Sequence, residues 1–342
     1  PVLGGQAPGI KINNSINDKI DMNLGWVRMI EDQNATNRGA ADLFYLTAPV
    51  NKKELSVTPW ISYARVEKEG MDQSPSYGGA FDTVNAFNRG MQTFDVTSLG
   101  TLESQFADSG NYTDAVNAYW LGFLTNINSV PQMDIQLEGA YGNLNAEQNQ
   151  NDRSGYWFRG LFDYTEMENM TPSMFGFYSS GEDDDLSDGS ETMPYFGNDG
   201  VTITQTGYLT GFGSITNIGS YNYALMQYVP HAMWQLGLGL KNIKVTEDFN
   251  FTVAASYMQG TNDKDAFDGL SQNDRDTLLG TELTTEDAAW EMDVSGSYSI
   301  YENLTALLEL GYAQVDLDES VWGDNPKDAP AMKCVTGIKY SF

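Results

Sequence analysis

Charged side chains alternate with apolar ones along several stretches of the sequence. In 132–142, for example, Asp134 and Glu138 alternate with Met133 and Leu137. Because successive side chains of a β-strand point to opposite faces, such charges would line one side of a sheet. Rings of charged side chains at close quarters set ion selectivity in a pore. The residues that this pattern predicts to line a pore are Asp21, Asp134, Glu138, Arg159, Asp163, Lys241, Glu291, Asp293, Glu309 and Lys333.

The balance of these charges predicts a weak preference for cations, because acids outnumber bases among them. Opposing acids and bases across a lumen would also suit a general diffusion channel. The alternative for any single residue is that its charge only solvates a wide, wet wall. Both interpretations remain open at this point.

Two stretches, 182–188 and 263–276, are dense in carboxylates. Calcium favours clustered carboxylate oxygens, so Asp183, Asp185 and Asp188 are candidate calcium ligands. Neither stretch has the full alternating ligand spacing that ends in Glu at position twelve. The alternative is a solvated acidic surface, which divalent ions would bridge loosely to neighbouring lipopolysaccharide.

The residues of nucleophilic catalysis are scarce. A nucleophile–base pair normally requires a histidine, and the sequence has one, His231, with no recognisable serine motif nearby. The single cysteine, Cys334, allows no intramolecular disulfide. It shares the apolar face of Met332 and Ile338, so we expect an inert side chain facing lipid or a neighbouring subunit. We therefore predict that the protein is not an enzyme and has no cofactor besides the candidate calcium.

The composition argues against nucleic acid as a partner. Asp and Glu number 47 against 18 Lys and Arg, for a formal net charge of −29, which a phosphate backbone would repel. No run approaches the ~18 consecutive apolar residues of a membrane-spanning helix. That absence does not exclude a membrane protein, because the apolar content of an alternating barrel strand averages away.

The charged positions lie in stretches with a period of two residues, which predict β-strands. Pro59 is unexpected inside one of them, because proline cannot donate to the ladder. The clearest of these stretches are 20–30, 54–66, 132–142, 155–164, 232–245, 249–259, 287–300, 304–315 and 331–342.

The connections between these stretches alternate between short turns and long loops. Outer-membrane barrels place short turns on the periplasmic side and long loops outside. The pattern therefore predicts an all-β, antiparallel transmembrane barrel as one domain over 1–342. Among its loops, 67–113 is a candidate to narrow the pore, and 181–221 and 260–286 are acidic extracellular loops. The short turns are 17–19, 49–53, 126–131, 165–172, 246–248 and 301–303.

The strand count predicted from the sequence is about 12 to 16. About thirteen strands can be recognised, whereas bacterial single-chain barrels use even numbers. The first strand also runs from the outside inward, so we expect that upstream strands are missing from this sequence and that the barrel closes with about sixteen. The alternative is that 199–230 contains further strands.

Aromatic residues at strand ends are expected to anchor the barrel at the membrane interfaces. Stacking platforms for sugars would instead have to face the lumen. The expected anchors are Trp26, Tyr63, Tyr141, Trp290, Tyr312 and Tyr340.

The closing strand ends on Phe342, with Tyr340 two residues before it. With this ending, the segments Trp234-Gln-Leu-Gly-Leu-Gly-Leu, Tyr301-Glu-Asn-Leu and Gly337-Ile-Lys-Tyr-Ser-Phe, and the opening Pro1-Val-Leu, the chain resembles the outer-membrane homotrimeric porins of sulfate-reducing bacteria, a Gram-negative general porin type.

The resemblance implies a homotrimer in the bacterial outer membrane, surrounded by lipid and lipopolysaccharide. It also implies passive uptake of small hydrophilic solutes, including sulfate and organic acids. The acidic balance departs from what an anion-selective channel suggests and leaves sulfate in doubt. The alternative is a structural or surface-interaction barrel whose acidic loops bind ions, lipopolysaccharide or other cells.

Overall fold

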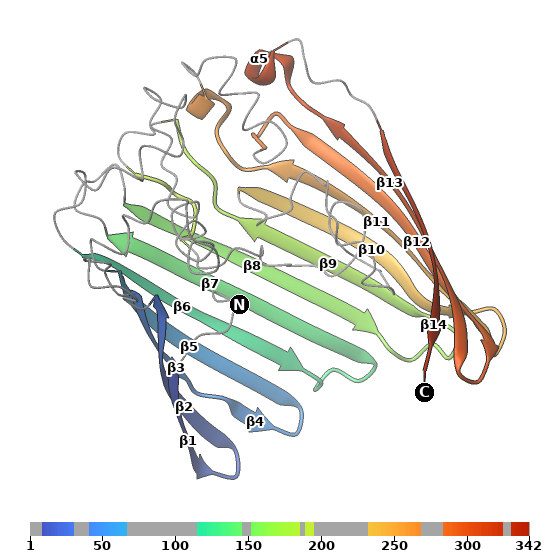
Figure 1. Ribbon diagram of the computed structural model, residues 1–342, viewed down its shortest axis with the longest axis horizontal. Coiled ribbons are helices and arrows are strands. Elements are labelled where there is room, and N and C mark those ends of the chain that lie inside the picture. The colour runs from blue at the N-terminus through green and yellow to red at the C-terminus, as the bar shows by residue number, and fades with distance from the viewer. Residues whose placement is uncertain are drawn as a thin grey trace.

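The strands lie side by side in nearly the order in which they occur in the sequence. The computed structural model describes residues 9–30, 41–66, 115–145, 152–184, 189–194, 232–267, 283–323 and 330–341. Their strands form one antiparallel sheet of 14 strands, which Figure 1 shows as a curved wall with β1 and β14 at opposite sides. The strands are β1 (Gly9–Asn17), β2 (Ile20–Ile30), β3 (Ala41–Thr47), β4 (Val50–Lys52), β5 (Leu55–Val66), β6 (Val116–Ile127), β7 (Met133–Asn145), β8 (Arg153–Tyr164), β9 (Thr171–Ser179), β10 (Met233–Lys244), β11 (Phe249–Gly260), β12 (Ala288–Tyr301), β13 (Leu304–Asp316) and β14 (Ala331–Tyr340).

Burial alternates along strands such as β7, β9 and β12, as the period of two predicts. On β12, Trp290 and Met292 are exposed, whereas Glu291 between them is buried. On a curved sheet, side chains crowd on the concave face and splay apart on the convex face. The buried, more polar positions therefore lie on the concave face and the exposed apolar positions on the convex face.

The connections sort by length to the two ends of the sheet. Short connections join β1 to β2, β6 to β7, β8 to β9, β10 to β11 and β12 to β13, and all lie at one end, called here the turn end. The strand ends that the longer connections join lie at the opposite end, called here the loop end. The predicted fold class, an antiparallel sheet of barrel type with alternating turns and loops, is confirmed.

The segment predicted as a turn at 49–53 is only partly a turn. Its middle residues, Val50–Lys52, form β4, which pairs with β2 and β5 and continues the line of β3. The break between β3 and β4 lies opposite Pro59 of β5, whose carbonyl accepts a hydrogen bond from Ala48 N at 3.0 Å. Because the partner strand is interrupted at this point, the missing donor of Pro59 costs no ladder hydrogen bond.

The two edges of the sheet are unpaired among the described residues. β1 pairs only with β2, and β14 only with β13, so the closure predicted from the sequence does not appear in these pairings. The path from β1 to β14 has 13 strands, with β4 beside it. A closed wall needs a partner for each edge.

Two short helices lie in connections at the loop end. These are η4 (Lys264–Phe267) and α5 (Glu319–Trp322), and the ring of Phe267 packs against that of Trp322 at 5.4 Å. No helix in the described ranges is long and apolar enough to cross a membrane. The predicted loop 67–113 lies outside the described residues, as do His231, most of 181–221 and the middle of 260–286.

Candidate pore wall and membrane face

The convex face carries large exposed apolar side chains. On β10, Leu236 and Leu238 are 50% and 61% exposed, and on β14 Met332 and Ile338 are 74% and 71% exposed. A continuous apolar surface of this extent marks a contact with lipid or protein.

Aromatic residues bound this apolar surface near both ends of the strands. At the loop end they form a belt in which neighbouring rings meet, for example Tyr63 with Tyr119 at 5.0 Å and Trp290 with Tyr312 at 4.9 Å. Trp290 and Tyr298 on β12 are eight residues apart, which is about 27 Å along the strand. Counted inclusively, this stretch has nine residues, which is within the roughly 9–11 residues that a tilted transmembrane strand needs. The belt at the loop end comprises Phe44, Tyr63, Tyr119, Tyr141, Tyr156, Tyr178, Trp234, Tyr257, Trp290 and Tyr312.

All six predicted interface anchors lie on the convex face, by the alternation of their strands. Cys334 is exposed on the same face, between Met332 and Ile338, as predicted. The convex face therefore has the apolar centre and aromatic borders of a membrane-facing wall.

The ten charged residues predicted to line a pore all point to the opposite, concave face. Each of the three bases among them has an acidic partner. Arg159 Nη1 lies 3.7 Å from Glu138 Oε2, Lys241 Nζ lies 2.9 Å from Asp163 Oδ1, and Lys333 Nζ lies 3.7 Å from Glu309 Oε2.

These pairs fall into two groups on the wall. The first charged group, Glu138, Arg159, Asp163 and Lys241, lies on β7, β8 and β10. The second charged group, Glu291, Asp293, Glu309 and Lys333, lies on β12, β13 and β14.

The remaining predicted acids lie outside these two groups. Asp134 is exposed opposite Asp163 in the β7–β8 register, and Asp21 accepts a hydrogen bond from Ser15 Oγ at 2.6 Å. Glu291 is the most enclosed of the ten, with 1% of its surface exposed. Acids outnumber bases seven to three across the ten residues, so this set of side chains has a net negative charge.

A short segment, 189–194, lies against the concave face at the loop end and is called here the strap. Ser190 pairs with the start of β8, accepting from Ser154 N and donating to Asp152 O, both at 2.9 Å. At its other end, Pro194 O accepts a hydrogen bond from Trp120 Nε1 on β6 at 2.6 Å. A side chain at Gly155 would overlap the backbone of the strap. The strap therefore covers the inward ends of β6 to β8, which the sequence did not indicate.

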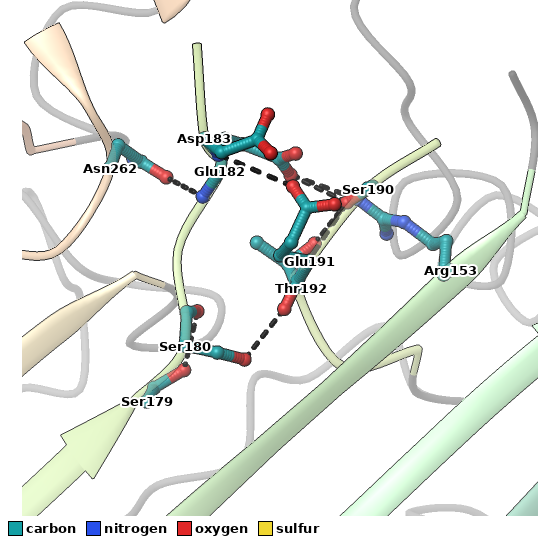
Figure 2. A network of polar contacts seen from close by, with 9 residues as sticks. All are labelled: Arg153, Ser179, Ser180, Glu182, Asp183, Ser190, Glu191, Thr192 and Asn262. Carbon is teal, nitrogen blue, oxygen red and sulfur yellow. Dashed lines mark hydrogen bonds and ion pairs between the residues drawn. The ribbon is translucent and has the colours of Figure 1, made fainter. Parts of the chain in front are cut away.

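A buried polar network ties the strap to the end of β9 (Figure 2). Arg153 Nη2 donates to Ser190 Oγ at 3.1 Å, and this hydroxyl donates to Glu182 Oε1 at 2.5 Å. The guanidinium nitrogen itself lies 4.0 Å from Glu182 Oε1. Glu182 N in turn donates to Asn262 Oδ1 at 2.9 Å. The network thus links β8, the strap and the connection that follows β11.

Burial controls the ionisation of the two glutamates of this network. Burial raises the pKa of Glu182, and the charge of Arg153 and the hydroxyls of Ser190 and Thr192 offset only part of that rise. Burial also raises the pKa of Glu191, and the neighbouring acids Glu182 and Asp183 add to the effect. Both carboxyl groups therefore hold a proton more readily than they do in water.

A second buried acid at the loop end, Asp287, binds groups that precede β12 and groups of α5 and its N-cap. Its Oδ2 accepts from Thr284 N, Thr284 Oγ1 and Trp322 Nε1, and its Oδ1 accepts from Asp318 N, all at 2.7–2.9 Å. Asn262 Nδ2 donates to Leu283 O at 2.9 Å beside it. The described residues that precede β12 and those that follow β13 are therefore held together by a fully bonded carboxylate.

The calcium prediction is only partly within the described residues. Asp183 is exposed, and its backbone N donates to Glu191 Oε2 at 3.2 Å. Asp185 and Asp188 lie outside the described ranges. Across the described ranges, no group of three or more His, Cys, Asp or Glu side chains could hold a metal ion. Calcium binding by Asp183, Asp185 and Asp188 stays a prediction.

Three aromatic side chains on the concave face were not predicted from the sequence. Tyr45, Trp60 and Trp120 all point inward, each leaning over a glycine of the adjacent strand. The alternation along the strands could have predicted their orientation, because a residue next to an outward-facing one must face inward. Trp60 lies next to the outward Ile61, and Trp120 next to the outward Leu121.

No protein-family model matches the chain, and no curated protein matches it in sequence. Among solved structures it is similar to the outer membrane protein OprD from Pseudomonas aeruginosa, with 12% identity, a TM-score of 0.46, and coverage of 97% of this chain and 68% of OprD. It is similar to OccAB3 of Acinetobacter baumannii, with 9% identity, a TM-score of 0.47, and coverage of 97% and 67%. A third is OccK7 (OpdD) of P. aeruginosa, with 12% identity, a TM-score of 0.42, and coverage of 91% and 64%. The chain thus spans about two thirds of the length of these proteins.

Proposed function

We propose that this chain forms the wall of a water-filled channel in the bacterial outer membrane, through which small hydrophilic solutes and ions diffuse passively. The observation that carries the proposal is the contrast between the two faces of one sheet. The convex face is apolar and bordered by aromatic belts, whereas the concave face carries three acid–base pairs. Lipid requires the first surface and water the second.

The net negative charge of the ten predicted pore-lining residues supports a weak preference for cations. We further propose that the channel is a homotrimer in contact with lipid and lipopolysaccharide, as its resemblance to general porins implies. The narrower assignment to the porins of sulfate-reducing bacteria stays a prediction, because no family model matches the chain.

Single-channel recording in a planar lipid bilayer tests the proposal. The purified protein should open in steps grouped in threes. The reversal potential across a KCl gradient should then show weak cation preference. A reconstituted protein that never conducts would contradict the channel and favour the structural barrel.

A variant of the first charged group links the conductance to this wall. Glu138→Gln removes one inward acid that lies about a quarter exposed beside Arg159, so the cation preference should fall. Glu168→Gln, in the exposed turn between β8 and β9, is the matched control and should leave the reversal potential unchanged.

A further inference from the structure

The concave face of the described strands has an uncharged part, which lies between the inward Lys11 and Asp21 of β1 and β2 and the charged part on β7 to β14. The strands β7 to β14 carry the two charged groups. The inward positions of β3, β5 and β6 carry no charged residue in the ranges described. Solutes that touch this second part of the wall meet aromatic rings, hydroxyl groups and amides.

Two of the inward aromatic rings of this uncharged part are accessible, and they lie on neighbouring strands, whereas Trp120 is fully buried. Tyr45 on β3 leans over Gly25 of β2, where its ring occupies the place of a Cβ atom. Trp60 on β5 leans over Gly122 of β6 in the same way, with Cζ2 2.5 Å from the position of a Cβ atom. A ring that leans over the adjacent strand turns one face to the wall and the other to the lumen. Both side chains are half-buried, so part of each ring remains accessible.

Polar groups flank both rings. Thr47 lies directly opposite Trp60, and its Oγ1 accepts a hydrogen bond from Asn23 Nδ2 at 3.0 Å. Ser62 lies directly opposite Tyr45; it is 6% exposed, and its Oγ has no hydrogen-bond partner in the structure as described. A buried hydroxyl without a partner is costly, so the Ser62 position favours a polar group that can reach it. These five residues, Asn23, Tyr45, Thr47, Trp60 and Ser62, are called here the aromatic patch.

We propose that the aromatic patch binds neutral carbohydrate on its way through the channel. A sugar ring has an apolar face of C–H groups and an edge of hydroxyl groups. The apolar face fits an aromatic ring that lies flat against the wall, and the hydroxyl groups fit the neighbouring Thr, Ser and Asn side chains. The absence of charge on these inward positions favours a neutral solute over an ionic one. The inference rests on the proposed function, because the patch must face a water-filled lumen.

Current blockage by maltotriose tests this inference. Maltotriose should reduce the single-channel current of the wild-type protein with a saturable concentration dependence. Trp60→Ala should raise the half-maximal concentration about five- to tenfold, because it removes one stacking face. Trp60→Phe, which keeps an aromatic ring, should have a half-maximal concentration close to that of the wild type. Trp290→Ala, which removes an equal ring from the convex face, should leave the half-maximal concentration unchanged.

Three results would overturn the inference: a conducting channel that maltotriose leaves unaffected, an equal response of wild type and Trp60→Ala, or Trp60-dependent blockage by succinate but not by maltotriose. Titration calorimetry of the detergent-solubilised protein with maltotriose measures the same binding without a current. A silent bilayer with calorimetric binding would therefore contradict the channel alone, and absence of calorimetric binding would contradict the sugar site.

Discussion

At the scale of single residues, the loop end of the sheet depends on two acids that are buried in different ways. Both oxygens of Asp287 accept hydrogen bonds, from four donors in all. Glu182 has Ser190 on one oxygen, whereas its Oε2 has no hydrogen-bond partner within the described part of the chain. The first acid is fully satisfied as a carboxylate, and the second is not. They should respond differently to mutation and to pH.

Asp287→Ala should destabilise the loop end by about 3 kcal/mol, because it leaves the buried donors of Thr284 and Trp322 without an acceptor. Hydrogen exchange of the Thr284 and Asp318 amides and the fluorescence of Trp322 report the change. Asp318→Ala, which removes only the cap of α5, is the control and should cost about 1 kcal/mol. Equal effects of the two variants would contradict the assigned role of Asp287.

The attachment of the strap should weaken as pH rises. Because burial raises the folded-state pKa of Glu182 above its ordinary 4.5, the folded protein binds this proton more tightly than the unfolded chain does. The contribution of Glu182 to stability is therefore fully present below pH 4.5 and is lost as pH rises through the raised pKa. Hydrogen exchange at Ser154 and Ser190, corrected for intrinsic rates, should accelerate over that interval.

Glu182→Gln should flatten this pH dependence, because a glutamine does not titrate. Glu191, whose pKa is raised in the same direction, would leave a smaller residual slope. Glu168→Gln in the exposed turn should behave as wild type. If the strap of the wild-type protein were better protected from hydrogen exchange at high pH than at low pH, the predicted direction of the pH dependence would be wrong.

At the scale of elements, glycines let aromatic rings on one strand lie against the next. Phe175 on β9 is 2% exposed and lies over Gly237 of β10, beside Ala254 and Leu161. A methyl group at Gly237 would overlap the Phe175 ring. Gly176, the next residue after Phe175, faces the other way, and an added Cβ there would make only ordinary contacts, at 3.7 and 3.9 Å.

Gly237→Ala should therefore destabilise the barrel wall by about 1–3 kcal/mol, the usual cost of overpacking. Gly176→Ala should cost far less. Urea unfolding of the two variants in lipid vesicles measures the difference. Equal stabilities would contradict the packing of Phe175 over β10.

The strands and their faces could be predicted because both depend on local alternation, which the sequence displays directly. The ten inward charges and the outward Cys334 follow from it. The strap could not be predicted, because its position depends on contacts such as that between Trp120 and Pro194, which are far apart in sequence. The loop-end network escaped notice for the same reason, since Glu182 meets Asn262 only in the folded chain. The acid–base pairing required the strand register, which alternation alone does not fix.

At the scale of the whole molecule, the assignment of the two faces decides the environment of the protein. Leu238, 61% exposed on the convex face, would be surrounded by lipid, whereas Gln136, exposed on the concave face, would be in water. A soluble protein would expose both positions to water. The two positions therefore discriminate between the environments.

Leu238→Arg should destabilise the protein in lipid vesicles by about 2–4 kcal/mol, the cost of a charge on the lipid face near the bilayer midplane. Gln136→Arg should be tolerated within about 0.5 kcal/mol. Unfolding by guanidinium chloride in vesicles measures both. If Leu238→Arg were as well tolerated as Gln136→Arg, the convex face would not be in contact with lipid.

The division of the concave wall has a consequence for how molecules cross it. Cationic and anionic groups occur together on β7 to β14, while β3 to β6 present rings and hydroxyl groups. A permeating molecule that touches both regions would be oriented by them. Its most polar end would face the charged groups, and its flattest surface would face the aromatic rings. Selection would then depend on the internal asymmetry of the permeant as well as on its bulk, and mirror-image isomers of equal size could cross at different speeds.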